Sequence, residues 1–365
     1  MLRATARRFF TSECAPHREE WEQSGMAPPA IWRRAGELGL LCPRLPEEFG
    51  GSGSDFLAAM ALVEEQVLAG VAAPVLSLHS DVVAPYVYHY GTEEQRARVL
   101  PMMATGQWIG AIAMTEPGAG SDLRGMRTRA VRAGSDFLVS GQKTFISNGA
   151  CADLIVLAAK TEAGISLFLV ETEDLAGFSR SEPLEKLGQW SADIAELFFD
   201  EVRLPGSALL GGSEGQGFEQ LTQRLTEERL LTGIAAVAMM DAAIAATKAY
   251  ASERTAFGRR VIDFQNSRFK LADAVTDADV ARVFLERCVI KFMAGDLRPE
   301  EAAMLKYWST DIQCRIVDDC MQLHGGYGYM LEYPISRMWL DSRVARIYGG
   351  ANEIMKEIVG RSLSR

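Results

Sequence analysis

Apolar side chains recur at helical spacing before residue 108 and after residue 214, and they form short or alternating runs between these regions. Apolar residues three or four positions apart are typical of an amphipathic helix, whereas short alternating runs are typical of strands. The first region predicts helices over residues 4–12, 29–38, 56–67 and 93–104. The last region predicts longer helices over residues 217–252, 268–294, 299–323 and 351–363. Alanine-rich faces in the first of these longer helices favour a tight bundle, because small residues let helices approach closely.

The middle of the chain predicts strands at intervals of roughly ten residues, with turn signals such as Ala-Gly-Ser-Asp at 133–136 between them. The runs lie at residues 109–114, 128–132, 137–140, 154–159, 165–171 and 195–202. Short strands at this spacing favour a small antiparallel barrel or sandwich. The sequence therefore predicts a mainly α protein with a central β-domain. We expect an N-terminal helical domain over residues 1–108, a middle β-barrel domain over 109–210 and a helical bundle over 211–365.

Composition narrows the classes of function. The 365 residues carry a net charge of −10 and show no basic stripe, which argues against nucleic-acid binding. The longest apolar runs, such as 154–159, fall short of the ~20 residues of a membrane-spanning helix. Six scattered cysteines without a C-x-x-C pair favour a reducing cytoplasm and argue against a metal site or redox dithiol. The Arg-rich start over residues 1–10 is interpreted as a structural helix rather than a transit peptide, because acidic residues follow it directly.

Two glycine- and hydroxyl-containing segments are the first candidates for ligand binding. Met-Thr-Glu-Pro-Gly-Ala-Gly-Ser-Asp at 114–122 leaves backbone N–H groups accessible, and Thr115 and Ser121 add hydroxyl donors. A plain Pro-Gly turn between two domains is the alternative. In Gly-Gln-Lys-Thr-Phe-Ile-Ser-Asn-Gly at 141–149, Phe145 and Ser147 would share one face of a strand, which suits a flat heteroaromatic cofactor. A barrel-interior Phe145 with a surface Ser147 is the alternative.

Three further motifs lie in the helical region. Arg254-Thr-Ala-Phe-Gly258 follows a long helix, so Gly258 is a candidate C-terminal cap and Arg254 is either a phosphate ligand or a solvated helix-end arginine. Gln-Leu-His-Gly-Gly-Tyr-Gly at 322–328 allows close backbone approach, or it simply ends a helix. In Arg-Ile-Tyr-Gly-Gly-Ala-Asn-Glu at 346–353, two glycines before a helix either offer free N–H groups or form a flexible joint.

Taken together and in this order, the motifs at 114–122, 141–149, 254–258 and 322–328 make the chain resemble the acyl-CoA dehydrogenase family over essentially its whole length. The resemblance implies an N-terminal helical domain, a middle β-barrel and a C-terminal four-helix bundle. It also implies an FAD-dependent flavoprotein that acts on acyl-CoA, passes electrons to an electron-transfer flavoprotein and assembles as a homotetramer or homodimer. A role in β-oxidation of fatty acids follows, in a bacterial cytoplasm, or in the mitochondrial matrix if the source is eukaryotic.

The resemblance also implies individual contacts. Phe145 would lie against the isoalloxazine, where most relatives carry Trp, and Ser147 would reach the N5 edge. Arg254, Phe257 and Gln265 would contact the pyrophosphate and adenine end across a subunit boundary. The remaining residues expected at the cofactor are Met114, Thr115, Gly120, Ser121, Gln322, Leu323, Gly325, Gly326, Asn352 and Glu353. The residues expected at the substrate are Ser121, Arg229, Tyr348 and Gly349.

The chain departs from the family at the catalytic base. Most relatives have Tyr-Glu-Gly where this chain has Tyr348-Gly349-Gly350, and Ala351 replaces the usual Thr. A minority, including isovaleryl- and long-chain acyl-CoA dehydrogenases, carry the base in a Glu-Arg pair early in the long bundle helix, which Glu228-Arg229 matches.

Glu228 is therefore the candidate base that removes the α proton while hydride passes to flavin N5, which gives a trans-2-enoyl-CoA. Glu227 would point about 100° away around the helix. An ordinary acidic residue near a helix start is the alternative for Glu228. Burial near the flavin would raise the pKa of this carboxylate, and the Gly349 N–H would stabilise the enolate by analogy with the family. The absent side chain at Gly349 hints at bulky acyl groups. A flavin monooxygenase or acyl-CoA oxidase on the same fold is the second candidate function, and a non-catalytic flavoprotein is the third.

Overall fold

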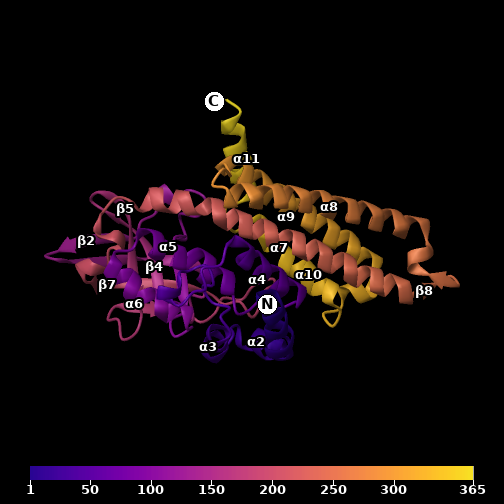
Figure 1. The fold of residues 1–365 in the computed structure, drawn as a ribbon, viewed down its shortest axis with the longest axis horizontal. Helices are drawn as coiled ribbons and strands as arrows, with labels where there is room; N and C mark the ends of the chain where they lie inside the picture. Colours follow the sequence, from indigo (N-terminus) through magenta and orange to yellow (C-terminus); the bar gives the residue numbers. More distant parts are fainter. Residues whose placement is uncertain (365) are drawn as a thin grey trace. The chain divides into compact units, whose positions relative to one another are not determined.

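The computed structural model describes residues 1–364, and its contacts divide them into two compact units. The first unit comprises residues 1–62, 71–186 and 190–225, and the second comprises residues 63–70, 187–189 and 226–364. Figure 1 shows the chain with its elements labelled. Two helices, α4 (Phe56–Leu68) and α7 (Gly217–Glu253), contribute residues to both units.

Short helices form the N-terminal part of the first unit. Besides the start of α4 they are α1 (Leu2–Arg8), α2 (Arg18–Ser24), α3 (Pro29–Glu37), α5 (Ala84–Tyr90) and α6 (Glu93–Ala104). The helix predicted over 4–12 is instead α1 followed by a π-helical turn over Phe9–Cys14, which buries both Phe9 and Phe10 completely. The helix predicted over 93–104 is confirmed as α6. Its start is set by a capping box in which Thr92 and Gln95 bond each other's backbone N–H.

A seven-stranded curled sheet forms the rest of the first unit. Its strands are β1 (Gly110–Ala113), β2 (Arg129–Ala133), β3 (Asp136–Ser147), β4 (Leu154–Thr161), β5 (Gly164–Glu171), β6 (Phe178–Arg180) and β7 (Ile194–Leu204). The order is β1-β4-β2-β3-β7-β6, and β5 pairs with β4. The predicted strands are confirmed, but the expectation of purely antiparallel pairing is wrong, because β4 runs parallel to both β1 and β2. The long connection between β1 and β4, which contains the β2–β3 hairpin, supplies the crossover that parallel pairing requires.

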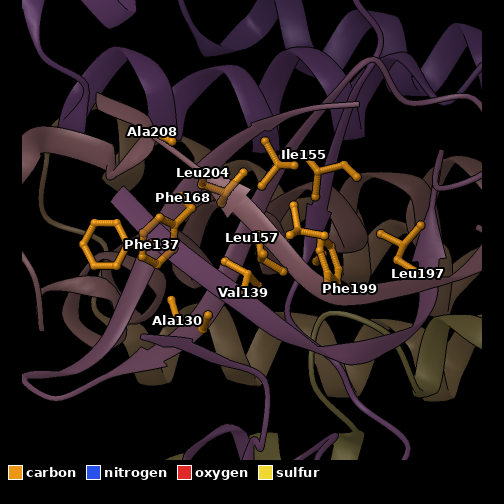
Figure 2. Packing of buried hydrophobic residues seen from close by; sticks show 14 of the residues in the cluster. Ala130, Phe137, Val139, Ile155, Leu157, Phe168, Leu197, Phe199, Leu204 and Ala208 are labelled. Atoms are coloured by element: carbon orange, nitrogen blue, oxygen red, sulfur yellow. The ribbon is translucent and has the colours of Figure 1, made fainter. Parts of the chain in front are cut away.

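The inner face of this sheet carries the hydrophobic core of the unit. Figure 2 shows Phe137, Phe168, Leu157 and Phe199 pointing into one cluster from four different strands. Phe137 and Phe168 meet edge to face, with ring centroids 5.0 Å apart, an arrangement that the aromatic quadrupole favours. Ile146, near the end of β3, belongs to the same buried cluster, so packing anchors the last residues of this strand.

Helices dominate the second unit. Beyond the later part of α7 they are α8 (Gln265–Met293), α9 (Pro299–Leu323), α10 (Pro334–Ser342) and α11 (Asn352–Ser362). Figure 1 shows α7, α8 and α9 running side by side. A side chain at Gly233 of α7 would lie 2.8 Å from Leu305 of α9, so the small residue permits this close approach. The predicted helices over 217–252, 268–294, 299–323 and 351–363 are confirmed, and α10 is an additional helix.

Helix α7 is long and apolar enough to cross a membrane by length and composition alone. Yet 72% of its most apolar window is buried inside the fold. Helix packing within the protein therefore accounts for the apolar character of α7.

The interpretation of Gly258 as a helix cap is wrong. Helix α7 ends at Glu253, and a two-stranded hairpin follows, with β8 at Thr255–Ala256 and β9 at Arg259–Arg260. Phe257 and Gly258 form its turn with φ values of 49° and 77°. Two successive positive φ angles match the twist of a tight hairpin, and glycine adopts them without steric cost.

Candidate functional site

The two glycine-containing segments of the first unit lie against each other. The backbone N–H of Thr144 donates to the carbonyl of Thr115 at 3.0 Å, and the Lys143 ammonium donates to the carbonyl of Met114 at 3.0 Å. Glu116 and Ala119 exchange two backbone hydrogen bonds of 3.0 Å, so Pro-Gly at 117–118 does form a tight turn. The turn and the ligand-binding hypothesis are therefore compatible, because the turn presents the residues that follow it.

A buried ion pair joins these segments. Lys143 Nζ lies 2.8 Å from Glu116 Oε1, and the two side chains are 0% and 6% exposed. The Glu116 carboxylate also accepts hydrogen bonds from the backbone N–H groups of Arg127 and Thr128. Burial alone would raise the pKa of Glu116, but the Lys143 ammonium and the backbone donors hold it at about 2. The pair therefore holds the start of the 114–122 segment onto β3.

The exposed side of these segments carries the aromatic ring and hydroxyl groups that the sequence singled out. A β-bulge between Lys143 and Ile146 gives Phe145 a φ of 58° and leaves it 65% exposed. The alternative of a barrel-interior Phe145 is therefore wrong. Ser147 is half-buried, and Gly120 and Ser121 are exposed. The hydroxyls of Ser147, Ser121 and half-buried Thr115 have no hydrogen-bond partner among residues 1–364, so they remain available as donors.

Glu228 lies on α7 in the second unit. Its side chain is half-buried, whereas Glu227 is only 2% exposed. Arg229, the next residue, is 6% exposed, and its Nε has no hydrogen-bond partner in the described chain. Burial lowers the pKa of the Arg229 guanidinium, and the nearby Glu228 charge partly opposes that shift. The Glu228 carboxylate and the Arg229 guanidinium, whose Nε is without a partner in the described chain, therefore occur together at this turn of α7.

The glycine turn before α11 packs against the same part of α7. Gly349 and Gly350 have φ values of 65° and 96°, a region that L side chains rarely adopt. A Cβ built at Gly349 would lie 3.3 Å from Thr232 Oγ1. The Thr232 hydroxyl in turn donates to the Glu228 carbonyl at 3.1 Å. The structure thus brings Glu228, Arg229 and Gly349 into one region of the second unit, while Tyr348 beside them is partly exposed.

Asn352 is directed toward α9. It is 1% exposed, its Oδ1 accepts from Lys306 at 2.9 Å, and its Nδ2 donates to the carbonyl of Tyr307 and to Asp311. The adjacent Glu353 is exposed. The predicted cofactor contact of Asn352 stays a prediction, and the structure adds a packing role for its amide.

The motifs at 254–258 and 322–328 meet near the other end of α7. The Arg254 guanidinium lies 5.4 Å from the ring centroid of Tyr327, and Tyr250 stacks on His324 with centroids 4.3 Å apart. Gly325, Gly326 and Phe257 are exposed, and Phe257 is 96% exposed. Gln265 and Gln322 are also exposed, and Leu323 is half-buried. The sequence assigned these residues to one cofactor-binding set, and the structure places Arg254 beside the 322–328 segment.

Sequence reasoning missed three residues that organise these regions: Lys143, Thr232 and Lys306. Lys143 and Lys306 are 0% exposed and Thr232 is 6% exposed. A lysine inside an otherwise apolar helical pattern is the signal that could have identified Lys306, because a fully buried ammonium requires partners.

The chain is similar to known proteins over its whole length. Family models for the acyl-CoA dehydrogenase N-terminal, middle and C-terminal domains match residues 1–107, 111–202 and 215–364. The chain is 45% identical over 370 residues to the long-chain specific acyl-CoA dehydrogenase, mitochondrial, of Rattus norvegicus, covering 100% of this chain and 86% of that protein.

Two solved structures are similar along the whole chain. The acyl-CoA dehydrogenase from Geobacillus kaustophilus has a TM-score of 0.97 and 45% identity, covering 100% of this chain and 97% of that one. A glutaryl-CoA dehydrogenase from Mycobacterium smegmatis in complex with FADH2 has a TM-score of 0.94 and 30% identity, covering 100% and 93% of the two chains.

Proposed function

This chain belongs to the acyl-CoA dehydrogenase family, and we propose that it converts an acyl-CoA thioester into the trans-2-enoyl-CoA with Glu228 as the base. The protein is an FAD-dependent oxidoreductase, as its family implies. The observation that carries the proposal is the pairing of a half-buried Glu228 with a glycine at position 349. Position 349, where most relatives carry the catalytic glutamate, is a glycine in this chain, and Glu228 of α7 would provide the carboxylate instead.

The residues present fit FAD. In the first unit, Phe145 offers an exposed aromatic ring, and the hydroxyls of Thr115, Ser121 and Ser147 have no hydrogen-bond partner among the described residues. These groups suit a flat heteroaromatic ring with polar edges. Met114 and Gly120 belong to the same segments. In the second unit, Arg254 offers a cation for a phosphate beside the exposed backbone of Gly325 and Gly326. The further residues that we propose at the cofactor are Phe257, Gln265, Gln322, Leu323, Asn352 and Glu353.

The chemistry requires that a proton leave the carbon beside the thioester carbonyl. The Glu228 carboxylate takes this proton, and negative charge develops on the thioester oxygen. The backbone N–H of Gly349 donates to no residue among 1–364, so we propose it as a donor to that oxygen; one such donor is worth about 2.7–4 kcal/mol. FAD, when bound, would supply the acceptor for the hydride of the β carbon. Arg229, Ser121 and Tyr348 complete the proposed substrate contacts.

The spacing along α7 supports a second subunit at each cofactor. Glu228 and the helix end at Glu253 are 25 residues apart, which corresponds to ~37 Å at 1.5 Å per residue. One dinucleotide does not span that distance. We therefore propose, as the family resemblance implies, that the 254–258 and 322–328 segments serve the cofactor of a neighbouring copy.

An exposed stripe on α8 supports the same proposal. Phe269, Val283 and Ile290 lie at multiples of seven residues and are 59%, 68% and 69% exposed. Apolar residues at this spacing share one face of a helix and favour helix–helix contact. A homotetramer or homodimer is the assembly that we propose.

Electron-transfer flavoprotein is the proposed acceptor, and β-oxidation of fatty acids is the proposed setting. The location stays as predicted, a bacterial cytoplasm or the mitochondrial matrix. We propose long-chain acyl-CoAs as the first substrates to test, because the rat relative is long-chain specific and Gly349 has no side chain to fill the acyl pocket.

Anaerobic mixing with acyl-CoA tests the proposal. The purified protein should be yellow and should bleach with an acyl-CoA drawn from a panel of short, branched and long chains. Glu228→Gln should retain FAD. The rate at which acyl-CoA bleaches the flavin should fall by about 10²–10⁴, the usual contribution of a general base. Glu253→Gln removes an exposed glutamate at the other end of α7 and should bleach at the wild-type rate.

Two other outcomes would redirect the proposal. If Glu228→Gln is reduced as fast as the wild type, the base assignment is wrong, and Glu227→Gln becomes the variant to measure. If reduced nicotinamide bleaches the flavin and acyl-CoA does not, the protein is a monooxygenase on the same fold.

A further inference from the structure

Lys306 of α9 is buried completely and holds the glycine turn before α11. Its Nζ donates to the carbonyl of Gly350 at 2.7 Å and to Asn352 Oδ1 at 2.9 Å. Two adjacent glycines have no side chains with which to fix their own conformation. The position of this turn therefore depends on contacts from outside it, and Lys306 makes the charge-assisted one.

The same lysine lies beside the turn of α7 that bears Glu228. A Cβ at Gly349 would be 4.0 Å from Lys306 Cε and 3.3 Å from Thr232 Oγ1. The Thr232 hydroxyl bonds the Glu228 carbonyl. Lys306, the glycine turn and the Glu228 turn of α7 thus form one continuous set of contacts within the second unit.

The electrostatics of Lys306 are unfavourable for a residue with only a packing role. Burial lowers the pKa of Lys306 to about 8, and the positive charges of Arg229 and Arg346 act in the same direction, while Asp311 and Glu353 oppose them. A buried ammonium next to a buried guanidinium is costly, and an apolar side chain of similar length would pack there without that cost. The charge of Lys306 is explained instead by its two hydrogen bonds to the glycine turn and to Asn352.

We propose that Lys306 is a positioning residue for proton abstraction: it fixes the Gly349–Gly350 turn so that the Gly349 N–H and the Glu228 carboxylate keep their mutual placement. This inference rests on the proposed function. Small misplacements of reacting groups cost up to about 100-fold in rate. The loss of Lys306 should therefore slow flavin reduction about 10- to 100-fold at saturating substrate, while FAD content and substrate binding change little.

The test is rapid-mixing measurement of flavin reduction under anaerobic conditions, on the FAD-loaded enzyme. Lys306→Met keeps the length of the side chain and removes the charge and the donors. Lys306→Gln keeps an N–H donor on a slightly shorter chain and should recover part of the rate. The matched control is Lys291→Met, which breaks the ion pair of Lys291 with Glu301 between α8 and α9 and should leave the reduction rate unchanged.

Three measurements separate positioning from general stability. Thermal unfolding and the FAD absorbance ratio show whether each variant is folded and loaded. The maximal reduction rate and the substrate concentration at half-maximal rate show whether the defect lies in chemistry or in binding. An acyl-CoA deuterated at the α carbon shows whether proton removal has become slower, and the isotope effect should rise in Lys306→Met.

The outcomes are distinct. A loaded Lys306→Met that is reduced at the wild-type rate overturns the inference and leaves the proposed function intact. If Lys306→Met does not fold, Lys306→Gln decides, because it lacks the ammonium charge and its shorter side chain should recover only part of the rate: a wild-type rate overturns the inference, and a reduced rate with a larger isotope effect supports it. If no acyl-CoA reduces the wild-type flavin, the proposed function itself has failed, and the inference fails with it.

Discussion

The buried Glu116–Lys143 ion pair should give this protein a specific dependence of stability on pH. We consider Glu116→Gln, which keeps the shape of the side chain and removes its charge. In the folded protein the pKa of Glu116 is held at about 2, against an ordinary value of 4.5. The carboxylate is 6% exposed, so solvent screens this interaction little.

The magnitude follows from linkage. A difference of about 2.5 pH units in pKa between the folded and unfolded states corresponds to about 3 kcal/mol at neutral pH. Because the folded pKa is the lower one, this stabilisation is fully present above pH 4.5 and is lost as the pH falls toward 2. Between these two pH values, the unfolded state binds up to one more proton than the folded state. The free energy of unfolding of the wild type therefore falls by up to ~1.36 kcal/mol per pH unit, and that of the variant does not.

The assay is urea unfolding of the wild type and Glu116→Gln at several pH values between 7 and 3, followed by circular dichroism. The variant should be less stable by about 3 kcal/mol at pH 7, and the difference should narrow by ~2 kcal/mol at pH 3. The control is Glu48→Gln, which removes an exposed carboxylate of the same unit and should show no such narrowing. Parallel curves for the wild type and Glu116→Gln would refute the reasoning, because they would show that the carboxylate titrates alike in both states.

Two further predictions concern other parts of the chain. Gly141→Ala should cost about 1–3 kcal/mol in urea unfolding, because its Cβ would lie 2.6 Å from Thr128 Cα at a φ of 154°. Gly134 has a φ of 70°, and no described atom lies within 4 Å of an added Cβ, so Gly134→Ala should lower the free energy of unfolding by only about 1 kcal/mol, less than Gly141→Ala. Equal losses of stability in the two variants would contradict the packing argument. Arg254→Gln should weaken FAD retention about 10- to 100-fold, equivalent to the loss of one charge-assisted hydrogen bond. The FAD that remains bound after gel filtration at low and at high salt measures this effect. If the wild type retains the same amount of FAD at both salt concentrations, Arg254 makes no phosphate contact.

Most of the helices and strands could be predicted from the sequence because their signals are local. The apolar spacing over 299–323 matches α9, which has proline in its first turn and so begins where the pattern begins. The signals are weaker in short elements. The β8–β9 hairpin and α10 were missed, and Gly258 was misplaced, since a glycine after a helix can equally well cap that helix or form the next turn.

The pairing of strands and the environment of the charges needed the tertiary structure. Parallel contacts of β4 with β1 and β2 depend on how a long connection folds back, which no local pattern records. The bulge that turns Phe145 outward depends on its register against β7. The partners of Lys143 and Lys306 lie 27 and 44 residues away in the sequence.

The sequence by itself determined the chemistry available to this protein: a family pattern of glycines and hydroxyls, a glycine in place of the usual glutamate at 349, and a Glu-Arg pair at 228–229 on a long helix. Only the tertiary structure decided which charges are buried and what they hold. Burial and hydrogen-bond partners are properties of chain segments that meet in space, and the free energy of a buried charge depends on those partners rather than on its neighbours in sequence.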